Sequence, residues 1–313
     1  MATVPQESVS MLAMRGATVL AEVTAAGCTP RTRFQIASLS KQFTASAVLL
    51  LAQRGALELA NPIGRWIGGG PPSWSAITLH HLLSHTSGLG HWEDHPLVDP
   101  GRRYDPDELV AMFHRVPPLF APGTGWHYSS PGYVLLAQVA QRAADGPYHE
   151  VLADLVCTPL GMSDTFAGSP GDRHDVADGH DSAGGPVPSW ELDVTNMGTG
   201  DVWSTTGDLL TWIDGLRSGR LLDARHLDLM LTEQAPTGGR PEARGYGYGW
   251  FVGRRGGRRW FQHSGDNPGF RAFDACIPDA DWRVAVLSNS AVLSSAMLDD
   301  LLGTVLPEAG GSA

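Results

Sequence analysis

The chain has 313 residues, a formal net charge of -11, 42% hydrophobic residues and 18% charged residues. This composition predicts a globular protein with a sizeable buried core rather than a disordered chain. The acidic balance and the lack of a Lys/Arg-rich stripe argue against a nucleic-acid partner and against binding to an anionic membrane surface.

Nothing in the sequence indicates export or a membrane anchor. No apolar run approaches the ~18 residues that a membrane-spanning helix needs, and residues 1–10 lack the basic and apolar segments of a secretory signal. The three cysteines are far apart and do not form a disulfide framework. We therefore expect a cytoplasmic protein; the sequence does not indicate its oligomeric state.

Elements follow in chain order from apolar spacing and turn residues. Residues 9–14 and 18–23 predict a hairpin around Arg15-Gly16, and Ser38 opens a helix that ends near Gly55. Two further helices begin at Asp105-Pro106 and at Ser130-Pro131. The later part predicts helices at 208–216, 223–231 and 294–305, and strands at 248–252, 259–263, 269–277 and 282–287.

This order predicts an α/β (α+β) fold in which both chain ends build one antiparallel sheet flanked by helices. We expect a single domain over 1–313, with a sheet lobe from about 1–60 and 205–313 and a helical lobe at about 61–204. Ligand sites favour the junction between such lobes.

One residue stands out by its rarity. Of the 22 basic residues, Lys41 is the only lysine and the other 21 are arginines. A codon bias toward arginine accounts for the general pattern, but a position that keeps lysine is notable because lysine can lose its proton and arginine cannot.

Lys41 belongs to an S-x-x-K motif that begins at Ser38. Residues three apart on a helix share a face, so the hydroxyl and the amine can touch. A neutral lysine can then take the serine proton and create a nucleophile. The alternative is that Ser38 only caps the helix, but a cation in the first helical turn opposes the helix dipole.

Two further segments contain groups that suit acyl chemistry. Tyr128 can transfer protons beside a cation, although this segment alone favours the interpretation of a buried tyrosine next to an N-capping Ser130. The segment from His263 through Ser264 and Gly265 to Asp266 can offer a backbone N–H to an oxyanion, although an ordinary turn between strands also explains it.

Together, in this order and spacing, these segments resemble the serine β-lactamase and penicillin-binding-protein superfamily. The likeness is greatest to the class C β-lactamase and family VIII esterase-like branch. It covers about residues 9–306 and extends to segments 34–44, 82–89, 122–124, 159–162 and 248–250.

The resemblance implies a β-lactamase/transpeptidase-like fold and roles for individual residues. Ser38 would be the acylated nucleophile, while Lys41 and Tyr128 would share proton transfer and titrate as a coupled pair. The backbone N–H groups of Ser38 and Asp266 would form the oxyanion hole. Further catalytic or substrate-binding residues would be His263, Ser130, Ser264 and Gly265. No metal or organic cofactor is implied.

Two departures from the family pattern bear on the substrate. Ser130 stands where the family usually has Asn, and His263 replaces a fixed cation that would hold a carboxylate. Both changes favour ester chemistry over β-lactam or peptide carboxylate recognition. Trp126, which nearly adjoins Tyr128, and Trp203 are our candidates for the substrate side.

Clustered histidines raise the alternative of a metal site. His81 and His85 have the i, i+4 spacing of metal ligands, and the neighbouring histidines are His80, His91 and His95. No H-E-x-x-H motif or cysteine partner accompanies them, and we predict no metal.

The predicted function is hydrolysis of an ester or another activated acyl group, which makes a small-molecule acyl substrate the partner. The first alternative is ATP-independent acyl transfer to an amine or alcohol acceptor in a biosynthetic pathway, such as one for an antibiotic. Cleavage of a β-lactam or a D-amino-acid peptide is the second. A non-catalytic acyl-binding sensor on the same fold is the last.

Overall fold

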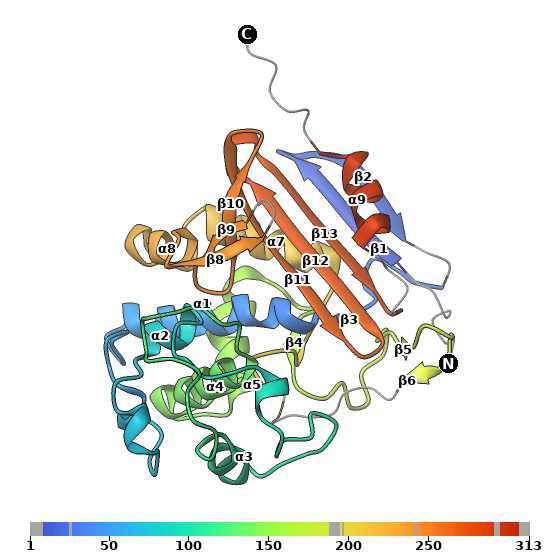
Figure 1. Ribbon diagram of the computed structural model, residues 1–313. Coiled ribbons are helices and arrows are strands. Elements are labelled where there is room, and N and C mark those ends of the chain that lie inside the picture. Colours follow the sequence, from blue (N-terminus) through green and yellow to red (C-terminus); the bar gives the residue numbers. More distant parts are fainter. Residues whose placement is uncertain are drawn as a thin grey trace.

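The computed structural model describes residues 9–24, 27–187, 195, 197–240, 243–290 and 295–306. Its main feature is an eight-stranded antiparallel sheet with the strand order β2-β1-β13-β12-β11-β10-β9-β8 (Figure 1). Both ends of the chain contribute, as the sequence predicts. The strands are β1 (Val9–Arg15), β2 (Thr18–Thr24), β8 (Ala235–Arg240), β9 (Ala243–Tyr246), β10 (Phe251–Arg255), β11 (Arg258–Asn267), β12 (Phe270–Ile277) and β13 (Trp282–Ser288).

Alternating side chains of the sheet serve two separate cores, because successive residues of a strand point to opposite faces. On β13, Val284 and Val286 join the cluster that includes Leu302 of α9 (Ser295–Gly303). Ala285 and Leu287 join the larger cluster on the other face. There α7 (Thr206–Arg217) packs against β13 and β1.

Helix α1 (Ser40–Gln53) lies between the sheet and the helices α2 (Leu79–Leu83), α4 (Ser130–Ala144) and α5 (Tyr148–Leu152) (Figure 1). It packs on α4, α5 and α8 (Ala224–Leu231), and Phe43 stacks on Trp212 of α7 at 4.6 Å. The other helices are α3 (Pro106–Phe113) and α6 (Thr158–Leu160). Within the part of the chain that is described, no helix is both long enough and apolar enough to cross a membrane.

The strands near the expected site differ from the sequence prediction in three ways. Strands β8 and β9 are additional, and β10 begins at Phe251 rather than at residue 248. The reason for the later start is Gly249, which has φ +80° and whose Cβ, if present, would lie 2.8 Å from the Gln42 Cα of α1. Strand β11 does not end at His263 but continues to Asn267, so residues 263–266 belong to a strand and not to a turn.

Candidate active site

Ser38 is presented by a tight turn that precedes α1. The turn is η1 (Ala37–Leu39), and Ala37 takes the left-handed conformation with φ +49°, which is uncommon outside glycine. Ile36 is held by a hydrogen bond from its N–H to the Val202 carbonyl at 2.9 Å. Every residue in the fully described stretch 34–51 is buried except Ser38. The strained turn therefore presents one hydroxyl from an otherwise buried segment.

Lys41 lies directly behind that hydroxyl. Its Nζ is 3.1 Å from Ser38 Oγ and donates a hydrogen bond to the Thr199 carbonyl at 3.1 Å. The side chain is fully buried, and this burial lowers the pKa of Lys41 to about 7, although the Asp201 carboxylate acts in the opposite direction. A large fraction of Lys41 is therefore neutral near pH 7, with a lone pair that can accept the Ser38 proton.

The Tyr128 ring lies over the same amine. Its ring centroid is 4.8 Å from Lys41 Nζ, and its ring packs against His85 at 4.4 Å. The residue that caps the following helix α4 is Ser129, whose Oγ accepts the Gly132 N–H at 3.0 Å. The alternative interpretation of Ser130 as the N-cap is therefore wrong; Ser130 is the first residue of the helix.

Strand β11 runs immediately beside the Ser38 turn. A Cβ on Gly265 would lie 2.4 Å from the Ile36 carbonyl oxygen and 3.2 Å from the Ser38 backbone nitrogen. Only glycine permits this approach. The next residue, Asp266, points its carboxylate outward to Arg271 at 2.5 Å, with 73% of the side chain exposed. What Asp266 can offer beside Ser38 is therefore its backbone and not its charge.

His263 is buried and hydrogen-bonded on both ring nitrogens. Its Nδ1 is 2.7 Å from the Ser264 carbonyl, and its Nε2 is 3.2 Å from the Tyr246 hydroxyl. A carbonyl only accepts, so Nδ1 carries a hydrogen, and Nε2 of a neutral ring accepts from Tyr246. Tyr246 was not predicted from the sequence; the glycines that flank it and Tyr248 were the available signal.

The two tryptophans proposed for the substrate side differ in position. Trp126 is partly buried and packs with Tyr128 against Tyr246 and Phe251, close to the other site residues. Trp203, on β7 (Val202–Ser204), is fully buried. It stacks on Phe166 at 6.1 Å and meets Phe270 edge-on at 5.3 Å. The expectation that Trp203 faces substrate is therefore wrong, because its ring is enclosed in the core.

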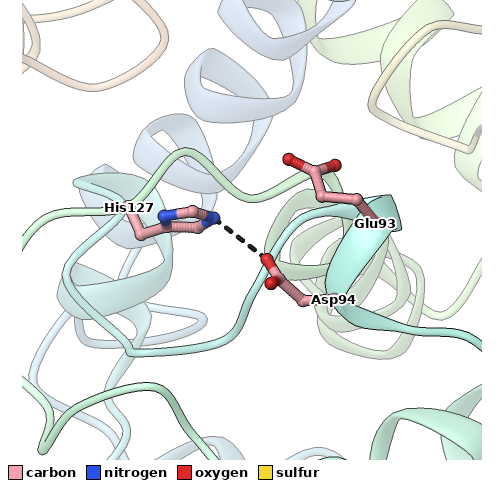
Figure 2. A group of neighbouring side chains, drawn as sticks. All are labelled: Glu93, Asp94 and His127. Carbon is pink, nitrogen blue, oxygen red and sulfur yellow. Dashed lines mark hydrogen bonds and ion pairs between the residues drawn. The ribbon is translucent and has the colours of Figure 1, made fainter.

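Three of the clustered histidines, His81, His85 and His91, accept backbone N–H groups, while His80 Nδ1 is 2.7 Å from the Tyr248 hydroxyl. His81 Nδ1 accepts the Thr78 N–H at 3.2 Å, and His85 Nδ1 accepts the Ser129 N–H at 3.1 Å, which commits one nitrogen of each. Figure 2 shows a different group, Glu93, Asp94 and His127, whose potential metal-ligating atoms lie within 4.8 Å of one another. Within it, His127 Nε2 donates to Asp94 Oδ2 at 3.0 Å.

A buried carboxyl group lies beneath the site on β12. Gln42, next to Lys41, donates its amide to Asp274 Oδ1 at 2.7 Å and accepts from Trp212 Nε1 at 3.0 Å. Complete burial raises the pKa of Asp274 to about 8. Asp274 is thus mostly uncharged near pH 7, and it adds little negative charge that would hold Lys41 in its protonated form.

Comparisons with known proteins agree with the family resemblance of the sequence motifs. The family model described as Beta-lactamase matches residues 6–304. Esterase EstB of Burkholderia gladioli is 32% identical over 259 residues, which cover 70% of this chain and 66% of that protein. A penicillin-binding protein of Bacillus subtilis (strain 168) is 30% identical over 283 residues, which cover 82% of this chain and 60% of that protein. The chain thus spans less than two thirds of the length of either relative.

Solved structures share the fold. The D-amino acid amidase of Ochrobactrum anthropi SV3 superposes with a TM-score of 0.82 at 24% identity, covering 95% of both chains. The octameric penicillin-binding protein homologue from Pyrococcus abyssi gives a TM-score of 0.81 at 23% identity, covering 95% of this chain and 73% of that one. The fold class predicted from the sequence is confirmed.

The approach of β11 to Ser38 predicts the effect of a single methyl group. Gly265→Ala pushes β11 away from the Ser38 turn, because its Cβ would overlap the Ile36 carbonyl. We expect kcat/KM toward an activated ester to fall about 10²- to 10³-fold, the usual effect of losing one oxyanion donor. The control is Gly64→Ala, since a Cβ at Gly64 meets nothing within 4 Å. Equal activity of the two variants would contradict this account of β11.

Proposed function

This chain belongs to the beta-lactamase family, and we propose that it is a serine enzyme that hydrolyses esters or other activated acyl compounds through Ser38. The observation that supports this most directly is the 3.1 Å contact between Ser38 Oγ and the buried amine of Lys41. A hydroxyl becomes a useful nucleophile when a base with a suitable pKa adjoins it. Lys41 meets that requirement because burial brings its pKa to about 7.

The proposed reaction has two halves. Ser38 Oγ attacks the acyl carbonyl, and its proton passes to the Lys41 amine as the new C–O bond forms. The oxyanion lies between the backbone N–H groups of Ser38 and Asp266, which need no reorganisation to receive it. Lys41 and Tyr128 return the proton to the leaving group, and the acyl-enzyme forms. Water then attacks the acyl carbon and gives a proton to the same base. The bond between the acyl carbon and Ser38 Oγ breaks, the base returns the proton to Oγ, and the acid leaves.

Ester substrates suit the residues that differ from the family pattern. His263 donates a hydrogen bond to the Ser264 carbonyl and accepts one from the Tyr246 hydroxyl. A lysine at this position would instead offer a permanent cation to a substrate carboxylate. Ser130 has no side-chain amide, which the family's usual Asn would offer to a substrate amide. Trp126 and Tyr128 are partly exposed and pack on the buried Tyr246 and Phe251, so these two outer rings, of which Tyr128 lies beside Lys41, suit an apolar acyl or alcohol group. The esterase relative supports the same choice.

Covalent labelling tests the nucleophile. Exposure to an activated phosphonate should add one adduct mass, and a peptide map should place it on Ser38. Ser38→Ala should lose the adduct and lower turnover of a nitrophenyl ester by several orders of magnitude, roughly 10⁶-fold as in other serine hydrolases. Ser73→Ala, which removes an exposed hydroxyl elsewhere, should label normally. Adduct formation on the Ser38→Ala protein would exclude this mechanism.

Turnover of the nitrophenyl ester by the unlabelled enzyme, with acceptors added, separates hydrolysis from transfer. If water resolves the acyl-enzyme, the product ratio stays constant as amine or alcohol acceptors are added. A product ratio that follows acceptor concentration would instead identify an acyltransferase.

The pKa of Lys41 predicts how kcat/KM depends on pH. The amine must be neutral to act as a base, so kcat/KM should rise with pH through an apparent pKa near 7, in line with the pKa of about 7 for Lys41. Lys41→Arg cannot supply a neutral base and should lose about 10²- to 10⁴-fold in kcat/KM across the range. Lys41→Met should be equally inactive but more stable than the wild type below pH 7. The folded wild type there carries a buried charge that the unfolded chain solvates. Thermal melts at pH 6 measure this; a lower Tm for Lys41→Met would contradict it.

A further inference from the structure

We propose that His91 is a positioning residue, which holds the Tyr128 segment (residues 127–130) over Lys41 by accepting the Ser130 N–H. The inference rests on the proposed function in one respect only, that Tyr128 acts in proton transfer. The His91 ring also lies edge-on to the Tyr128 ring at 5.4 Å. The histidine is thus in contact with both the phenol ring and the backbone that carries it.

The hydrogen bonds of the Tyr128 segment converge on one loop. The His127 N–H donates to the His85 carbonyl at 3.0 Å, and the Ser129 N–H donates to His85 Nδ1 at 3.1 Å. The Ser130 N–H donates to His91 Nδ1 at 3.1 Å. Two imidazole rings therefore receive the backbone N–H groups that follow Tyr128, and His85 and His91 together fix the path of this segment.

The loop that carries His91 is itself tied back to the Tyr128 segment. The His91 N–H donates to Asp94 Oδ2 at 2.9 Å, and the same oxygen accepts from His127 Nε2 at 3.0 Å. Figure 2 shows Asp94 pointing at His127, with Glu93 alongside. Asp94 closes a ring of hydrogen bonds that runs from His91 through Asp94 and His127 to Ser130. The contact between Asp94 and His127 therefore helps to hold the backbone of the Tyr128 segment in place.

This ring of hydrogen bonds forms only while the His91 imidazole is neutral, because Nδ1 accepts a hydrogen bond only without a proton. Burial is the main factor that lowers the pKa of His91, to about 4. Lys41 and His127 act in the same direction, while Glu93 and Asp94 oppose it. Burial, Lys41, His263, His91 and His127 likewise lower the pKa of His85. At neutral pH the Nδ1 atoms of His85 and His91 therefore carry no hydrogen and can accept, and the hydrogen of each ring is on Nε2.

Small shifts of Tyr128 matter to the proposed reaction. Its ring lies 4.8 Å from Lys41 Nζ at the site where the proton is handed on, and a displacement of about 1 Å at a reacting group can cost roughly 10²-fold in rate. Loss of the His91 acceptor leaves the Ser130 N–H without this partner at the start of α4. We therefore expect the effect on kcat to exceed the effect on KM.

Three substitutions at His91 distinguish the loss of the hydrogen-bond acceptor from the loss of side-chain volume. Asn offers an oxygen near the place of Nδ1, Gln offers one about a bond farther out, and Ala offers none. We expect His91→Asn to keep kcat within about threefold of the wild type. His91→Gln and His91→Ala should lower kcat by about 10- to 100-fold with little change in KM, within the loss expected for a misplaced reacting group. His174→Ala, at an exposed histidine, serves as the control and should behave as the wild type.

Hydrogen exchange measured by mass spectrometry on peptides covering residues 126–132 provides a second readout that needs no catalysis. His91→Ala and His91→Gln should lose amide protection there, and His91→Asn should keep it. Unchanged exchange in His91→Ala would overturn the proposal even if Ser38 is the nucleophile. Equal kcat losses in Asn and Ala variants would also overturn it. If labelling of Ser38 fails but the exchange pattern holds, only the proposed function falls.

Discussion

The burial of a single amine is the constraint on which the rest of the site depends. Lys41 is fully enclosed, with the Thr199 carbonyl and Ser38 Oγ as its hydrogen-bond partners at 3.1 Å. Enclosure in a low-dielectric interior disfavours the charged form, so the pKa falls to about 7. The same burial that weakens the fold at low pH therefore provides the base beside the nucleophile.

The surroundings of Lys41 limit the charge that acts on it. Asp274 is held mainly in its neutral form beneath the site, and His85 and His91 are held neutral beside Tyr128. Among the residues that the structure describes, Asp201 is the carboxylate whose charge raises the Lys41 pKa. Such a site costs stability, as functional sites commonly do. An arginine at position 41 would keep its charge, which explains why this position retains lysine in a chain otherwise rich in arginine.

Local rules made part of this site predictable. The S-x-x-K spacing fixes the Ser38–Lys41 contact within one helical turn, and both chain ends showed strand patterns that gave the sheet. The course of β11 past His263, the Tyr246 contact and the enclosure of Trp203 depend on tertiary packing, which a single sequence does not encode locally. The spacing of His81 and His85 raised the alternative of a metal site; the observed partners of His85 and His91, the N–H groups of Ser129 and Ser130, lie 44 and 39 residues away along the chain.

Direct titration of the Lys41 side chain tests the central claim. Because the sequence contains one lysine, protein labelled with ¹⁵N and ¹³C only at lysine gives a single side-chain amine signal by NMR. The account predicts that this signal titrates with a midpoint near the expected pKa of about 7. A midpoint near the ordinary lysine value of 10.5 would mean that the amine is charged at neutral pH and would contradict its role as the base.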